Sequence, residues 1–303
     1  MFTITWRHLI HSLRLIQENL MNKSYLPFAS AYATQNYLPA EEGILMAADS
    51  DFDYWYVDLS VHNDFVRNWD EQRIDNLKNL VAAHSVSPIF HGNYKIPLSS
   101  DVEELRQIAV SYVKREVELS GQFGSSLILH GSAIIEPRNV SFAKKQAMNN
   151  LLKSLKELVE YANQCNTEVW IENLSHYPDY RPFHYIFCCE EEYDFIFGSL
   201  DIPFFFDIGH ANVNAKAPVE RLITKYSNRI AGMSLSNNYG NKDQHYGIER
   251  GTLNYNGIIQ VIIEAGWKGI IAFETREKSP AGSLNELKTV YSTVCNENKW
   301  VFA

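Results

Sequence analysis

Short apolar runs recur along the chain from residue 27 onward, and longer amphipathic stretches separate them. The runs are at 54–59, 86–91, 125–130, 167–172, 202–207, 229–235 and 269–274, with a weaker one at 27–33. Unbroken apolar or β-branched runs of this length are typical of strands in a parallel sheet that is covered on both faces. The pattern therefore predicts eight buried parallel strands.

The stretches between these runs have helical periodicity. Apolar residues share one face over 102–113 and again over 151–162. Ser100 with Glu103, and Ser283 with Glu286, have the spacing of a capping box, which predicts helix starts at both places. No G-x-G-x-x-G follows any run, so nothing supports a dinucleotide-binding fold. A strand followed by a helix, repeated about eight times, predicts an α/β fold of the (β/α)8 TIM barrel type in a single domain.

The start of the chain lacks the alternation of strand-like and helix-like stretches. We expect residues 1–26 to be an N-terminal extension and residues 27–303 to be the barrel domain. Apolar residues recur within 1–20 at roughly helical spacing, but charged residues and histidines interrupt any signal-peptide core. Two interpretations stay open: a short amphipathic helix outside the main fold, or a start of translation at Met21.

Composition and charge limit the partners. The formal net charge is −9, so the chain lacks the concentrated Lys and Arg that nucleic acid and anionic membranes attract. The 4 cysteines have neither metal-motif spacing nor a disulfide framework, and no apolar stretch is long enough to span a bilayer. We therefore expect a soluble cytoplasmic protein that acts on a small molecule, with no nucleic acid and no membrane as partner. Assembly into a homo-oligomer stays open.

The polar residues that end the apolar runs are the candidate active-site residues. They are His91, His130, Glu172, Asp207 and Glu274. One such residue would be an ordinary hydrogen-bonding partner for a loop. Five on five strands would meet at one mouth of a barrel, and the long connections at 173–187 and 236–257 are typical of the C-terminal face, where barrel active sites lie.

The motifs around these residues resemble the xylose isomerase-like TIM barrel superfamily over about residues 27–295. The motifs are PIFHG at 88–92, LILHGS at 127–132, VWIENLS at 169–175, FFFDIGHAN at 204–212, KDQHYGIERG at 242–251 and IIAFET at 270–275. This superfamily includes sugar phosphate isomerases and epimerases and the endonuclease IV group. The resemblance implies that Glu172, Asp207 and Glu274 bind a divalent ion together with a strand-seven histidine. It implies further metal ligands, as in the endonuclease IV branch, at His91, His130, His210, Asp243 and His245.

The chain departs from the family at strand seven. The family's histidine there falls at Ser234, its second histidine at Ser236 and its aspartate at Asn237. Three alternatives stay open. A hard ion such as Mg²⁺ or Mn²⁺ is kept by the three carboxylates; the ion is shifted toward the imidazoles, which favour Zn²⁺; or no metal is bound.

The leading interpretation of function is an isomerase or epimerase. It would move a proton next to a carbonyl of a small polyhydroxylated substrate, a sugar or a sugar-derived acid, through an enediolate. Glu172 and Glu274 are the expected acid and base, and His210 is expected to position a substrate oxygen. The expected metal ligands are Glu172, Asp207, Glu274, Asp243 and His245. The expected substrate contacts are His91, His130, Asn173 and Arg250.

Other functions stay open on the same residues. A lyase or dehydratase needs the same proton abstraction. A metal-dependent phosphoester hydrolase of the endonuclease IV type, or a degenerate barrel without catalysis, is also compatible with the departure at Ser234. Aromatic residues crowd the two long connections and either form a lid that stacks on a sugar face or pack the loops together: Tyr177, Tyr180, Phe183, Tyr185, Tyr239 and Tyr246.

Overall fold

The barrel closes completely. The computed structural model describes residues 26–33, 38–179 and 182–297, so the N-terminal segment and its two interpretations lie outside the described residues and stay predictions. Eight parallel strands form a closed barrel in the order β1-β10-β9-β8-β6-β4-β3-β2. They are β1 (Ala29–Tyr32), β2 (Tyr54–Asp58), β3 (Ser87–His91), β4 (Leu127–His130), β6 (Val169–Glu172), β8 (Phe204–Asp207), β9 (Ile230–Leu235) and β10 (Ile270–Phe273).

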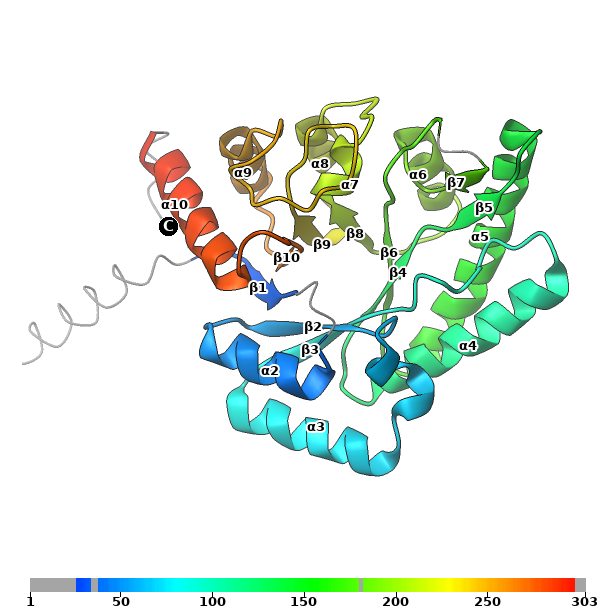
Figure 1. The fold of residues 1–303 in the computed structure, drawn as a ribbon, viewed down its shortest axis with the longest axis horizontal. Helices are drawn as coiled ribbons and strands as arrows, with labels where there is room; N and C mark the ends of the chain where they lie inside the picture. Colours follow the sequence, from blue (N-terminus) through cyan, green and yellow to red (C-terminus); the bar gives the residue numbers. More distant parts are fainter. Residues whose placement is uncertain (1–25, 34–37, 180–181, 298–303) are drawn as a thin grey trace, which may run out of the picture.

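Helices surround the strands on the outside (Figure 1). They are α2 (Ala40–Asp49), α3 (Glu71–His84), α4 (Glu103–Gly121), α5 (Val140–Gln164), α6 (Glu190–Phe197), α7 (Ile208–Asn212), α8 (Val219–Tyr226), α9 (Tyr255–Glu264) and α10 (Pro280–Glu297), with the short 3-10 turns His62–Asp64 and Val66–Asn68. The predicted (β/α)8 TIM barrel is confirmed. None of the helices in the described part of the chain combines the length and hydrophobicity needed to cross a bilayer.

The two predicted capping boxes are wrong. The Ser100 hydroxyl accepts from the backbone N–H of Val102, while the Glu103 carboxylate is bound at 2.9 and 2.7 Å by the buried guanidinium of Arg106. Ser283 lies inside α10, where its hydroxyl is 3.0 Å from that of Thr275. In both places another contact, within the helix for Glu103 and with Thr275 for Ser283, takes the side chain that a cap would need.

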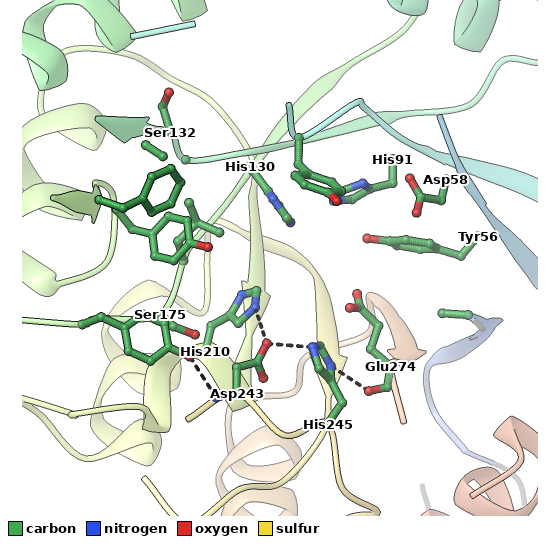
Figure 2. Close-up of a pocket in the computed structure, with 18 of the residues that line it drawn as sticks. Tyr56, Asp58, His91, His130, Ser132, Ser175, His210, Asp243, His245 and Glu274 are labelled. Atoms are coloured by element: carbon green, nitrogen blue, oxygen red, sulfur yellow. Dashed lines mark hydrogen bonds and ion pairs between the residues drawn. The ribbon is translucent and has the colours of Figure 1, made fainter. Parts of the chain in front are cut away.

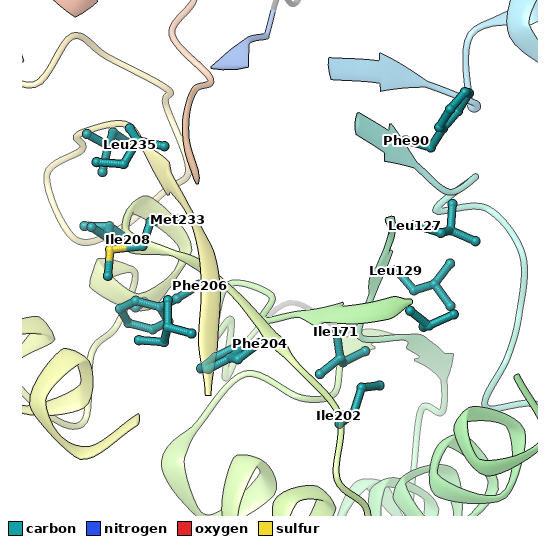
Figure 3. Packing of buried hydrophobic residues seen from close by; sticks show 14 of the residues in the cluster. Phe90, Leu127, Leu129, Ile171, Ile202, Phe204, Phe206, Ile208, Met233 and Leu235 are labelled. Atoms are coloured by element: carbon teal, nitrogen blue, oxygen red, sulfur yellow. The ribbon is translucent and has the colours of Figure 1, made fainter. Parts of the chain in front are cut away.

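Two apolar layers explain why the strand ends carry the chemistry. The outer layer packs between strands and helices, as Figure 3 shows for Phe90, Leu129, Phe204 and Met233. The inner layer fills the barrel with Ala31, Ala33, Tyr56, Ile89, Ile128, Trp170, Phe205 and Ala272. Every second residue of a strand faces the same side. On six strands, the inward-facing residue that follows the apolar one toward the C-terminal end is polar. These residues are Asp58, His91, His130, Glu172, Asp207 and Glu274.

A small extra sheet stands outside the barrel. The antiparallel strands β5 (Ala133–Ile135) and β7 (Phe183–Tyr185) come from the connections that follow β4 and β6. Ala133 pairs with Tyr185 and Ile135 with Phe183. The apolar pattern does not predict this sheet, because strands of three residues are too short to show a period.

Candidate active site

A cavity of about 340 Å³ opens at the carboxyl ends of the barrel strands. Figure 2 shows imidazoles of His130, His210 and His245 and carboxylates of Asp243 and Glu274 around this space. They come from β4, from α7, from the connection after β9 and from the residue that follows β10. The structure therefore brings most of the predicted residues together at one mouth.

Glu172 lies beneath three imidazoles and is fully buried. Its Oε2 atom is 3.2 Å from His91 Nε2, and its Oε1 atom is 3.5 Å from His130 Nε2 and 3.6 Å from His210 Nδ1. Burial by itself raises the pKa of Glu172, but His130 and His91 outweigh burial and hold this pKa well below its usual range. Glu172 is therefore an anion, and it is not among the residues that line the cavity.

The imidazoles of His210 and His245 converge on one carboxylate oxygen. Asp243 Oδ2 is 3.3 Å from His210 Nε2 and 2.7 Å from His245 Nε2. The Nδ1 atoms lie 2.8 Å from the carbonyl oxygen of Asn173 and 2.9 Å from that of Glu274. A carbonyl only accepts, so both Nδ1 atoms carry a proton and donate. Both Nε2 atoms are left to face Asp243, which is the arrangement that metal-binding histidines use.

His210 and Asp243 form an imidazolium–carboxylate pair, so a cation would bind here by displacing the proton on His210 Nε2. Burial lowers the pKa of His210, but Asp207 and Asp243 outweigh burial and raise it well above its usual value. Burial raises the pKa of Asp243, but His210 and His245 lower it far below its usual range. A carboxylate held between two imidazoles on fixed tautomers is a donor set that Zn²⁺ binds well.

Three overlapping groups of side chains can hold a metal ion, and their ligand atoms lie within 4.8 Å of one another in each group. They are His91 with His130 and Glu172, Glu172 with Asp207 and His210, and His210 with Asp243 and His245. In the described part of the chain, Glu172, Asp207 and Glu274 do not form such a group by themselves.

The strand ends also hold buried oxygens without a hydrogen-bond partner among the described residues. They are Glu172 Oε1, Asp207 Oδ2, Ser234 Oγ and Glu274 Oε1, on or just after β6, β8, β9 and β10. Buried polar atoms normally have partners, so water, a cation or protons would complete this cluster. Ser234 is fully buried and pairs in register with Asp207 and Ala272, at the place where the resemblance implies a histidine.

Glu274 is the carboxyl group best placed to exchange a proton. It lines the cavity, whereas the carboxylates of Glu172 and Asp207 are fully buried. Burial, together with the negative charges of Glu172 and Asp207, raises the pKa of Glu274 to about 7. Burial also raises the pKa of Asp207, to about 6. A cavity-facing carboxyl with a pKa near neutrality can act as acid or base at ordinary pH.

Two of the predicted substrate contacts lie elsewhere. The Asn173 amide is fully buried and clamps the backbone of Asp207, with its Nδ2 atom 2.9 Å from the Asp207 carbonyl oxygen and its Oδ1 atom 2.8 Å from the Asp207 nitrogen. Arg250 is exposed, pairs with Glu277 and lies 3.8 Å from the centre of the Tyr246 ring. The arginine that lines the cavity is Arg276. A sequence motif does not show whether an amide beside a ligand points outward or holds its neighbour.

Tyr56 and Asp58 line the cavity and were not predicted. The Tyr56 ring stacks on the His91 ring, with centroids 5.2 Å apart and an interplanar angle of 29°. Both residues are inward-facing positions of β2. The period-two pattern of the run at 54–59 was the available signal, since it puts residues 54, 56 and 58 on one face.

The fold and these groups define a class of protein: a TIM barrel that gathers carboxylates and imidazoles at the C-terminal face of its strands. More specifically, the chain belongs to the xylose isomerase-like TIM barrel family, whose model matches residues 45–292. The resemblance carried by the sequence motifs is thereby confirmed.

Individual proteins show the same likeness. The uncharacterized protein MJ1311 of Methanocaldococcus jannaschii is 25% identical over 232 residues, which are 75% of this chain and 77% of that protein. The crystal structure of a D-tagatose 3-epimerase-like protein has a TM-score of 0.77 at 20% identity and covers 90% of this chain and 100% of that one. The 3-keto-D-glucoside 4-epimerase of E. coli has a TM-score of 0.67 at 14% identity, with coverage of 89% and 99%. Structures this distant in sequence show a shared fold.

Proposed function

We propose that this protein is a divalent-metal-dependent isomerase or epimerase that moves a proton next to a carbonyl of a small polyhydroxylated substrate. The observation that carries the proposal is Glu274, a cavity-facing carboxyl whose pKa is raised to about 7 by burial and by neighbouring carboxylates. Support also comes from the structural likeness to a 3-epimerase-like protein and a 4-epimerase, which act on sugars by their names.

The ion is assigned to His210, Asp243 and His245. The two Nε2 atoms and the carboxylate oxygen already converge there, and backbone carbonyls hold both imidazoles in the required tautomer. A divalent cation bound at this group would polarise the carbonyl of the substrate and so ease removal of the neighbouring proton. Zn²⁺ suits the imidazoles, and Mn²⁺ is the alternative with more oxygen ligands.

The other residues divide the remaining work. In an isomerisation, Glu274 takes the proton from the carbon next to the carbonyl and returns it to the neighbouring carbon of the enediolate, because its carboxyl group reaches the cavity. An epimerisation would need a second proton donor on the opposite face of the enediolate. Glu172 is assigned a positioning role: its carboxylate forms ion pairs with the imidazoles of His91 and His130 and so keeps both rings in place. Those two imidazoles line the cavity and are placed to donate hydrogen bonds to substrate hydroxyls.

The proposal is tested by solvent isotope exchange. The zinc-loaded protein is incubated in D₂O with D-tagatose, D-psicose and a 3-keto-D-glucoside. We expect deuterium to enter at the carbon next to the carbonyl of at least one substrate, and Glu274→Gln to slow this by about 10²–10⁴-fold. Exchange in none of the three, or equal exchange in the variant, would contradict the proposed reaction.

A metal-dependent phosphoester hydrolase is the second candidate. It is favoured by the three overlapping ligand groups, because sites with neighbouring metal ions stabilise both oxygens of a phosphoryl displacement. Metal analysis separates the candidates: one divalent ion per chain supports the isomerase, and two or more zinc ions with hydrolysis of bis-p-nitrophenyl phosphate support the hydrolase.

A further inference from the structure

One wall of the cavity differs from the ionisable side just described. It consists of Leu174, Tyr177, Phe183 and Tyr185, and Tyr94 adds a further aromatic ring to the lining. The rings are continuous: the centroids of Tyr177 and Tyr185 are 6.0 Å apart, and those of Phe183 and Tyr185 are 5.3 Å apart. We call the first four residues the aromatic wall.

The wall is built on a sheet, which gives it a fixed direction. Phe183 and Tyr185 are alternate residues of β7, so their side chains leave the same face of the sheet, and both line the cavity. The intervening His184 is buried on the other face, where its Nε2 atom is 3.2 Å from the carbonyl oxygen of Glu136. Tyr185 pairs in register with Ala133, which also lines the cavity.

The wall is tied to the ion-binding group. The Tyr177 hydroxyl accepts a hydrogen bond of 2.9 Å from the backbone N–H of Asp243. A molecule that contacts the wall is therefore held next to His210, Asp243 and His245. The wall and the reacting groups are two sides of one cavity, not two separate pockets.

A buried hydroxyl group provides a polar contact within this apolar surface. Ser175 lines the cavity and is 3% exposed, and its Oγ atom has no hydrogen-bond partner among the described residues. The neighbouring Ser132 is engaged, since its hydroxyl accepts from Ser99 Oγ at 2.7 Å. A buried hydroxyl without a partner is unfavourable, so a ligand atom that pairs with Ser175 would be selected.

We propose that the aromatic wall is a subsite for a second ring and that the substrate is a glycoside of a keto sugar, whose carbonyl lies on a ring carbon other than the glycosidic one. Its reacting sugar then lies at Glu274 and its aglycone ring against Phe183 and Tyr185. An aryl ring presents an apolar face that stacks on aromatic side chains, and Ser175 can pair with the linking oxygen. The inference rests on the proposed function for the reacting end only.

The test is equilibrium binding, measured calorimetrically without turnover on the zinc-loaded protein. The probes are p-nitrophenyl β-D-glucopyranoside and methyl β-D-glucopyranoside, which differ only in the aglycone. We expect the aryl glycoside to bind about tenfold more tightly, the size of one good aromatic contact. Phe183→Leu and Tyr185→Leu keep apolar volume but remove a ring, and each is expected to remove most of this preference. Phe195→Leu, on α6 and outside the cavity lining, is the matched control and should retain it.

Three results would overturn the subsite. They are equal affinity for the two glycosides in the unmodified protein, a preference that survives both ring removals, and no binding of either probe at millimolar concentration. Failure of the subsite and failure of the proposed function are separable. A protein that prefers the aryl glycoside but exchanges no proton contradicts the isomerase alone, and an active enzyme without the preference contradicts the subsite alone.

Discussion

The strand-end oxygens and the His210–Asp243–His245 group lie at the same end of the barrel but differ in how many of their polar atoms are hydrogen-bonded. In the second group both imidazoles have their outer nitrogen bound to a backbone carbonyl and their inner nitrogen directed at one carboxylate. At the strand ends, four oxygens have no hydrogen bond within the described part of the chain, and β9 supplies the hydroxyl of Ser234. The chain has Ser234 where the resemblance implies a histidine, whereas the ligand atoms of His210, Asp243 and His245 lie within 4.8 Å of one another. We therefore propose the second group, and not the strand ends, as the place of the ion.

The largest expected effect is on catalysis. Glu274→Gln removes the cavity-facing carboxyl while keeping its shape, so we expect exchange of the substrate proton to fall by about 10²–10⁴-fold. Zinc affinity should change little, because the backbone carbonyl that holds His245 is unaffected. Glu277→Gln, three residues along and half exposed, is the control and should leave exchange unchanged. A fall in zinc affinity equal to the fall in rate would mean that Glu274 is chiefly a ligand.

The second expected effect is on zinc affinity. Asp243→Asn replaces the carboxylate on which both imidazoles converge with a neutral amide, so we expect affinity to fall by about 100-fold or more. Calorimetric titration of chelator-stripped protein measures this. Asp201→Asn, whose side chain is 99% exposed, is the matched control. Unchanged affinity in Asp243→Asn would place the ion at the strand ends instead.

The third prediction rebuilds the less complete site. Ser234→His puts an imidazole among Glu172, Asp207 and Glu274, so we expect a second, additional equivalent of Zn²⁺ or Mn²⁺ to bind. Its binding should raise the melting temperature in the presence of metal, because a ligand that binds only the folded state stabilises it. Ser236→His, two residues along the chain, serves as a positional comparison. Identical binding stoichiometry in the Ser234→His variant and the unmodified protein would show that the strand-end oxygens no longer form a site.

Some features of the fold and the site could be predicted from the sequence, and others could not. The barrel and its strand-end residues could be predicted, because on six of the eight strands the inner layer ends in a polar side chain two residues after an apolar one, as at Ile128 and His130. The clamp between Asn173 and Asp207 could not, since it joins residues 34 positions apart. The sheet of β5 and β7 could not either, because its stability comes from pairing between two distant connections and not from local periodicity.

The smallest expected effect concerns a buried carboxyl outside both groups. Glu116 on α4 also has an oxygen, Oε2, with no hydrogen bond to any residue that the structure describes, while its Oε1 atom accepts from the Asn93 backbone N–H. Burial raises its pKa to about 8, so the folded protein keeps a proton that the unfolded chain, with a pKa of 4.5, releases. The unfolding free energy should therefore fall as pH rises from 4.5 to about 8, and be flat above that.

Glu116→Gln should flatten this part of the pH profile, measured by urea unfolding at several pH values. Because the neutral amide keeps the hydrogen bond to Asn93, the variant should be at least as stable as the unmodified protein at pH 8. A parallel pH profile in the two proteins would show that Glu116 is ionised when folded. It would also weaken the use of unpaired oxygens to separate protonated acids from candidate ligands.

Location of the bound ion tests the central claim most directly. Anomalous diffraction at the zinc edge, from crystals of the zinc-loaded protein, gives the position of the metal independently of any substrate. We expect the anomalous peak of the zinc ion between His210 Nε2, Asp243 Oδ2 and His245 Nε2, which already lie within 4.8 Å of one another. A peak found only among Glu172, Asp207 and Glu274, or no peak at any of these residues, would contradict it.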